Sequence, residues 1–176
     1  MEKKNVIAIL GVPRSGKVEA LGYLMAVFHL PKVSFGNVIQ SELLRRGIAP
    51  GYANERMVRD ELRNIHGEDY YANEVIKMID VNDTSENILV EGLENSADYQ
   101  VLKQHYGSRL HTITIHLPVR NIFSAFIHDV VQVLRLERGG PIAVTDHLVV
   151  NEGDISKMTA ALDMIMLVLG LWKKSL

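Results

Sequence analysis

The chain has 176 residues, of which 47% are hydrophobic and 23% charged, as in an ordinary globular domain. A formal net charge of -2 gives no electrostatic basis for binding nucleic acid or an anionic membrane, so we expect neither as a partner. The absence of cysteine excludes disulfides, thiol nucleophiles and cysteine-ligated metals, and it is compatible with a cytoplasmic location.

Neither end of the sequence has the pattern of a targeting or membrane segment. Residues 1–5 lead directly into an apolar run, so we expect no signal peptide. The most apolar stretch, 158–172, contains Asp163 and is shorter than a membrane span. It predicts a buried terminal helix or one face of a homodimer interface.

Residues 5–18 combine an apolar run with a glycine-rich turn. Val6 to Leu10 is typical of a strand buried on both faces of a parallel sheet. The turn fits the phosphate-loop pattern, in which glycines let backbone N–H groups surround phosphate oxygens and a lysine reaches the β- and γ-phosphates. We therefore expect ATP to bind at the loop residues Gly11, Pro13, Arg14, Ser15, Gly16, Lys17 and Val18, with Lys17 also catalytic.

The metal ligand, the identity of the loop and the role of Arg14 are each open to more than one interpretation. Val18 occupies the position at which the pattern places a serine or threonine, whose hydroxyl binds magnesium. A glycine-rich strand-to-helix turn with an incidental lysine is the other interpretation of the pattern. The Arg14 side chain either contacts a phosphate or extends into solvent.

The rest of the chain alternates strands with helices, which predicts an α/β fold with a parallel sheet covered on both faces. We expect strands at 6–10, 32–35, 88–90, 110–117 and 147–150, and helices at 18–28, 37–46, 53–66, 71–79, 96–105, 119–136 and 155–172. Ser96 is a candidate helix cap. Helical spacing places these side chains in the core: Val18, Leu21, Leu24, Met25, Phe28, Met57, Val58, Leu62, Ile65, Tyr71, Val75, Ile76, Ile79, Met158, Met164 and Met166.

Four segments occur in the order and spacing that are typical of one family of enzymes: the phosphate loop, Ser34 to Ile39, Ile88 to Leu93, and Asp146 to Gly153. With them the chain resembles small phosphate-loop kinases of the nucleoside monophosphate kinase and dephospho-coenzyme A kinase group. It is nearest to the archaeal dephospho-coenzyme A kinase-like proteins of uncharacterised role. The resemblance covers nearly the whole chain and implies one domain, 1–176, with the three-layer P-loop NTPase fold and sheet order 2-3-1-4-5.

The resemblance also implies separate binding sites for ATP and for the acceptor. The loop would hold ATP, and a helical part at about 36–80 would hold a small phosphorylatable acceptor. Glu91 stands where the family places an acidic residue near magnesium or the acceptor, which would give it a catalytic role; as a lone acid at a strand end it is equally a candidate capping residue. Arg120 resembles an arginine that lies along the adenine, and the turn at Asn151 would form the other wall of the adenine pocket.

The chain departs from the family pattern around the reacting groups. The family commonly shows Gly-Asp-x-x-Arg where this chain has Gly36 to Gln40, and Glu94 stands where an arginine often follows strand three. Between strands four and five, a lid rich in arginine and aspartate is shortened to about 128–141, with Arg135 and Arg138 left. Because magnesium and arginines carry most of phosphoryl-transfer catalysis, these losses weaken the expectation of an efficient kinase.

Other polar residues have both a functional and an ordinary interpretation. Arg45 and Arg46 either replace the missing acceptor arginines or form a solvated helix face. The row Arg56, Arg59 and Arg63 either approaches an acceptor phosphate or is an ordinary charged face. The histidines show no metal-site spacing, so we expect no metal ligands among them.

Three functions follow from these observations. The first is an ATP-dependent kinase of the nucleotide or dephospho-coenzyme A type, with magnesium organised by Glu91. The second is a catalytically weakened nucleotide-binding protein that acts as a sensor or assembly partner, with little dependence on magnesium. The third is a structural relic that binds no nucleotide.

Overall fold

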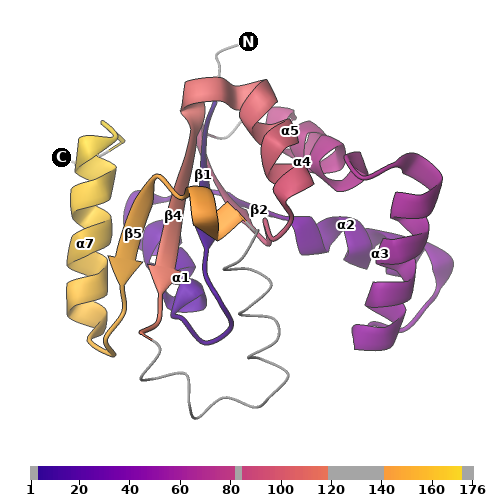
Figure 1. Ribbon diagram of the computed structural model, residues 1–176, viewed down its shortest axis with the longest axis horizontal. Helices are drawn as coiled ribbons and strands as arrows, with labels where there is room; N and C mark the ends of the chain where they lie inside the picture. The colour runs from indigo at the N-terminus through magenta and orange to yellow at the C-terminus, as the bar shows by residue number, and fades with distance from the viewer. Residues whose placement is uncertain (1–3, 82–84, 119–140, 172–176) are drawn as a thin grey trace.

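The computed structural model describes residues 4–81, 85–118 and 141–171 (Figure 1). Five parallel strands form one sheet in the order β2-β3-β1-β4-β5. The fold is therefore the expected α/β P-loop NTPase topology. The strands are β1 Asn5–Leu10, β2 Lys32–Ser34, β3 Asn87–Glu91, β4 Leu110–His116 and β5 His147–Val150.

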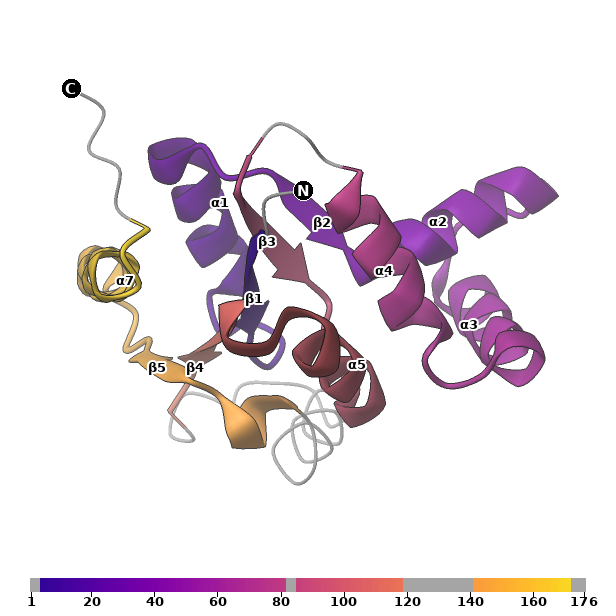
Figure 2. The same ribbon diagram turned by 90° about the horizontal axis from the view of Figure 1, so that it is seen from above.

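Helices cover both faces of this sheet (Figure 2). On one face lie α1 (Lys17–Phe28) and α7 (Ile155–Val168). On the other lie α2 (Phe35–Arg46), α3 (Tyr52–His66), α4 (Tyr70–Asp80) and α5 (Ser96–Tyr106). Short 3₁₀ turns, η1 (Gly107–Arg109) and η3 (Pro141–Val144), precede β4 and β5.

The central strand explains the apolar run near the start of the sequence. Successive side chains of β1 point to opposite faces, so Val6 and Ala8 join the core under α2–α5 while Ile7 and Ile9 join the core under α1 and α7. All four are almost completely buried. Because helices cover the sheet on both sides, both faces of this strand bury apolar side chains.

Two expected helix ends differ from the structure. Asn95, rather than Ser96, is the N-cap of α5, because the Asn95 side chain accepts a hydrogen bond from the N–H of Ala97 at 2.7 Å. The last helix ends at Val168, not near residue 172, since Gly170 adopts a left-handed φ of 69° just beyond it.

Several side chains expected in the core are instead exposed, because helical spacing does not reveal how wide the buried stripe is. Helix α1 buries only Ala20, Leu21 and Leu24 against the sheet. Helix α3 packs mainly on α2 and α4, so its buried residues are Val58 and Leu62. The misassigned residues are Val18, Met25, Met57, Ile65 and Met164.

Some expectations concern parts of the chain outside the described residues. These are the helix at 119–136, all but the last residue of the lid at 128–141, and the side chains of Arg120, Arg135 and Arg138. A single domain over 1–176 likewise stays a prediction. Of the described helices, none is both long and apolar enough to cross a membrane.

Candidate functional site

The phosphate loop joins the end of β1 to the start of α1. Gly11 and Gly16 have φ values of 149° and 100°, which favour glycine. A Cβ added to Gly11 would lie 2.5 Å from the Ser15 Oγ and 2.6 Å from the Ile115 carbonyl oxygen. Both glycines of the pattern are thus required by the backbone path. Arg14 also adopts a left-handed φ, of 64°, and its side chain is exposed.

A buried hydroxyl inside the loop fits a bound phosphate. Ser15 is completely buried, and its Oγ has no hydrogen-bond partner among the described residues. Buried polar atoms are nearly always paired, so an unpaired one next to Lys17 is a group that a ligand oxygen would satisfy. Together with the two glycines and the helix N-terminus at Lys17, it makes the loop suitable for the phosphates of a nucleotide.

Asn151 supports this loop from behind. Its side-chain Nδ2 donates a hydrogen bond to the Ser15 carbonyl at 2.8 Å, and its Oδ1 accepts one from the Gly153 N–H at 2.9 Å. The same Nδ2 would lie 2.5 Å from a Cβ at Gly16. Asn151 therefore lies against the loop backbone with both amide atoms engaged, while its expected contact with adenine stays a prediction.

The residues that would hold a resident magnesium ion do not fit one. Val18 has no ligating atom and is 72% exposed. The Glu91 carboxylate is paired with the Lys32 ammonium at 2.5 Å. In the described part of the chain, no group of three or more histidine or acidic side chains could hold a metal ion.

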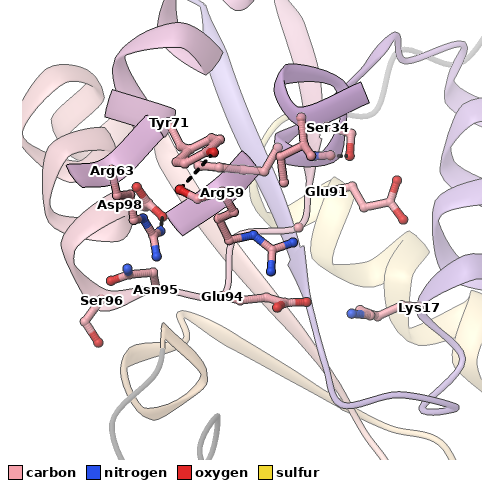
Figure 3. A pocket seen from close by; sticks show the side chains of 14 residues that line it. Lys17, Ser34, Arg59, Arg63, Tyr71, Glu91, Glu94, Asn95, Ser96 and Asp98 are labelled. Atoms are coloured by element: carbon pink, nitrogen blue, oxygen red, sulfur yellow. Dashed lines mark hydrogen bonds and ion pairs between the residues drawn. The ribbon is translucent and has the colours of Figure 1, made fainter. Parts of the chain in front are cut away.

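A pocket of about 720 Å³ extends from the phosphate loop to the helices α2–α5 (Figure 3). This volume suits a small ligand. Lys17 and Glu91 lie at one end in Figure 3, and Arg63 and Asp98 at the other. Its wall comprises Lys17, Ser34, Phe35, Gly36, Ile39, Arg59, Arg63, Tyr71, Glu91, Gly92, Glu94, Asn95, Ser96 and Asp98.

An ion pair between α3 and α5 lines the far end of the pocket. The Arg63 Nη2 lies 2.9 Å from the Asp98 Oδ2, and the Arg63 guanidinium lies 5.4 Å from the centre of the Tyr71 ring. Asp98 is 3% exposed. Its burial raises the pKa of the carboxyl to about 6, although Arg63 acts to lower it.

The pocket brings some of the expected site residues together and leaves others outside. Lys17, Gly36 and Glu91 line it, as do Arg59 and Arg63 from the arginine row. Arg45 and Arg46 lie elsewhere and pair with Glu42 and Glu61, while Arg56 lies 3.7 Å from Asp60 on the α3 surface.

Sequence reasoning missed Asp98 and Lys32. An acid in the first turn of a helix is common and carries no sign of burial. A lysine at the start of an edge strand is equally ordinary. Only the tertiary structure shows that Asp98 meets Arg63 and that Lys32 meets Glu91.

The chain is similar in sequence to proteins known as UPF0200. It is 34% identical over 120 residues to the UPF0200 protein of Methanosarcina acetivorans, covering 68% of this chain and 63% of the relative. The chain thus spans less than two thirds of the Methanosarcina protein's length. It is 26% identical over 166 residues to the protein of Methanococcus maripaludis strain C7, covering 85% of this chain and 89% of the relative. No family model matches the chain.

Several solved structures of similar shape are kinases. Shikimate kinase from Aquifex aeolicus is 17% identical with a TM-score of 0.53, covering 94% of this chain and 96% of that one. Shikimate kinase from Acinetobacter baumannii is 13% identical with a TM-score of 0.57, covering 98% and 97%. The chain has a P-loop kinase-like fold. A gluconokinase from Sinorhizobium meliloti, 12% identical with a TM-score of 0.55 and coverage of 97% and 98%, has a similar fold.

Proposed function

We propose that this P-loop kinase-like protein binds ATP at Gly11 to Lys17 and transfers its γ-phosphoryl group to a small acceptor. The observation that carries the proposal is the pocket of about 720 Å³, in which the loop lysine and the arginines of α3 line one continuous space. A donor phosphate at Lys17 and an acceptor beside α3 would lie within the same pocket.

The chain's own residues account for binding and orientation. The Lys17 ammonium attracts the β- and γ-phosphates, and the glycine-rich backbone surrounds them. Gly92 lets the end of β3 pack closely on the start of α2, since its φ is 84° and a Cβ there would lie 3.3 Å from the Phe35 Cβ. Bringing two reactants together in a fixed orientation is itself a large part of phosphoryl-transfer catalysis.

Several finer expectations belong to the same proposal. They are an adenine site formed by Arg120 and the turn at Asn151, a catalytic role for Glu91, a place in the dephospho-coenzyme A kinase group, and a cytoplasmic location. The names of the structural neighbours add shikimate and gluconate to the acceptors that deserve testing.

A second candidate is nucleotide binding without efficient transfer, as in a sensor or an assembly partner. It is favoured by one specific observation, namely that neither Val18 nor the paired Glu91 offers a free ligand for magnesium. The two candidates differ in turnover: only the first produces a phosphorylated acceptor at an ordinary kinase rate.

The deciding experiment combines calorimetric titration of ATP with a phosphoryl-transfer assay in the wild type, Lys17→Met and Lys77→Met. Lys77 is the matched control, because it is an exposed lysine paired with Glu74 on α4 and does not line the pocket. We expect Lys17→Met to abolish binding and transfer, and Lys77→Met to change neither. Binding without turnover would favour the second candidate, and no binding in the wild type would refute both.

A further inference from the structure

The charges that line the pocket are not all available to a ligand. Three cationic and three acidic side chains contribute to its wall. The Glu91 carboxylate is already paired with Lys32, and Asp98 with Arg63. This leaves three side chains without an ion-pair partner among the described residues: Lys17, Arg59 and Glu94.

Arg59 is held on the pocket wall by a well-anchored segment of α3. Its neighbour Val58 is completely buried, and Leu62 one turn later is nearly so. The Tyr71 hydroxyl donates a hydrogen bond to the Arg59 carbonyl at 3.3 Å. Figure 3 shows the Arg59 guanidinium extending into the middle of the pocket. A half-buried guanidinium that has no ion-pair partner in the described part of the chain is suited to bind one carboxylate through two parallel hydrogen bonds.

Glu94 lies between Arg59 and the phosphate loop. In Figure 3 its carboxylate lies between the Arg59 guanidinium and the Lys17 ammonium. Lys17 and Glu94 also line a second, small cavity beside the loop, of about 10 Å³, which supports their proximity. A free carboxylate at this place accepts a hydrogen bond from a hydroxyl group and repels a second anion.

We propose that the acceptor is a small hydroxy acid, whose carboxylate binds Arg59 and whose hydroxyl binds Glu94 next to the phosphates at Lys17. This inference rests on the proposed function. A phosphate monoester carries almost two negative charges, and here it would meet Arg59 as the one guanidinium without an ion-pair partner among the described residues, next to the repelling Glu94. The arrangement therefore selects against nucleoside monophosphates as acceptors.

The implied transfer is a balanced substitution at the γ-phosphorus of ATP. The acceptor hydroxyl oxygen forms a bond to the γ-phosphorus, and the bond from that phosphorus to the β–γ bridging oxygen breaks. The electron pair of the broken bond leaves with ADP. The hydroxyl proton passes to the Glu94 carboxylate and from there to water.

The test measures acceptor binding by calorimetry without nucleotide, and transfer from radiolabelled ATP. The probes are D-glycerate, shikimate and D-gluconate, with glycerol as the uncharged analogue and AMP and dephospho-coenzyme A as phosphate-bearing acceptors. The variants are Arg59→Met, Arg59→Lys and Glu94→Gln. Their matched controls are Arg56→Met and Glu74→Gln, since neither Arg56 nor Glu74 lines the pocket.

We expect at least one hydroxy acid to bind and to be phosphorylated. Arg59→Met should weaken its binding about 10- to 100-fold, as loss of a charge-assisted pair implies. Arg59→Lys should retain part of the affinity, and Glu94→Gln should lower kcat more than it raises KM. The controls should stay within about twofold of the wild type in these assays.

Three results would overturn the inference: binding of none of the hydroxy acids, preference for AMP or dephospho-coenzyme A, or equal effects of Arg59→Met and Arg56→Met. Failure of the proposed function has a different signature. In that case the wild type would bind no ATP, while the binding of hydroxy acids at Arg59 would still be measured independently.

Discussion

Asn151 acts on the phosphate loop through the backbone of Ser15. Its hydrogen bond to the Ser15 carbonyl fixes the backbone of the loop. We predict that Asn151→Ala weakens ATP and GTP binding by the same factor, about tenfold, because the loop holds phosphates and not the base. Calorimetry with both nucleotides measures this, with exposed Asn73→Ala as control. A loss confined to ATP would instead identify Asn151 as an adenine contact.

The Lys32–Glu91 pair predicts how nucleotide binding depends on magnesium. Magnesium dehydrates reluctantly and is usually bound by one or two carboxylates in addition to phosphates. Because Lys32 occupies the Glu91 carboxylate, ATP affinity of the wild type should change less than about threefold with magnesium.

Lys32→Met frees that carboxylate, so magnesium should then tighten ATP binding about 5- to 10-fold, an effect absent from the Lys77→Met control. Calorimetric titration with and without EDTA is the measurement. Strong magnesium dependence of the wild type would contradict this account.

At the scale of elements, the Arg63–Asp98 pair ties α3 to α5, with Tyr71 of α4 beside it. Since burial raises the pKa of Asp98 to about 6, the folded protein binds a proton there that the unfolded chain has already released. Its contribution to stability is therefore complete below about pH 4 and is lost as the pH rises through 6.

We predict that the free energy of unfolding of the wild type falls by up to about 3 kcal/mol between pH 4 and 6.5 because of Asp98. In Asp98→Asn this part of the fall should be absent. Urea denaturation at a series of pH values measures this slope. Asp60→Asn on the exposed face of α3 is the control and should retain the wild-type slope. If Asp98→Asn keeps that slope as well, burial does not raise the Asp98 pKa.

At the scale of the whole molecule, stability depends on two cores separated by the sheet. Helix α7 contributes Met158, Leu162 and Met166 to the core it shares with α1, while Met164 is 60% exposed. We predict that Met166→Ala lowers the free energy of unfolding by about 2–5 kcal/mol. Met164→Ala should change it by less than about 0.5 kcal/mol. Denaturant titrations compare the two, and similar values would contradict the assigned face of α7.

The homodimer expected from the apolar end of the chain stays a prediction. The described residues that would carry such an interface are Met164, Leu167 and Val168, all exposed on α7. Sedimentation equilibrium of the wild type provides the direct measurement.

Sequence patterns predict this fold well because the strands are apolar or rich in β-branched residues, and glycines or prolines mark many of the turns. The 147–150 strand agrees with β5 in both ends, and the others differ by one residue or so. The ion pairs in and beside the pocket, in contrast, cannot be predicted from the sequence. Lys32 and Glu91 lie on neighbouring strands, and Arg63 and Asp98 on separate helices, so no local pattern pairs them.

The position of β1 in the centre of the sheet has a consequence for folding. Asn5 pairs with Asn87 and Val6 with Leu110, so β1 finds both of its neighbours only after the chain has been synthesised through β4. Such high contact order slows folding and leaves an apolar segment exposed during translation. Because Ser15 also needs Asn151, the phosphate loop attains its final shape only after β5 and the turn beyond it have been synthesised.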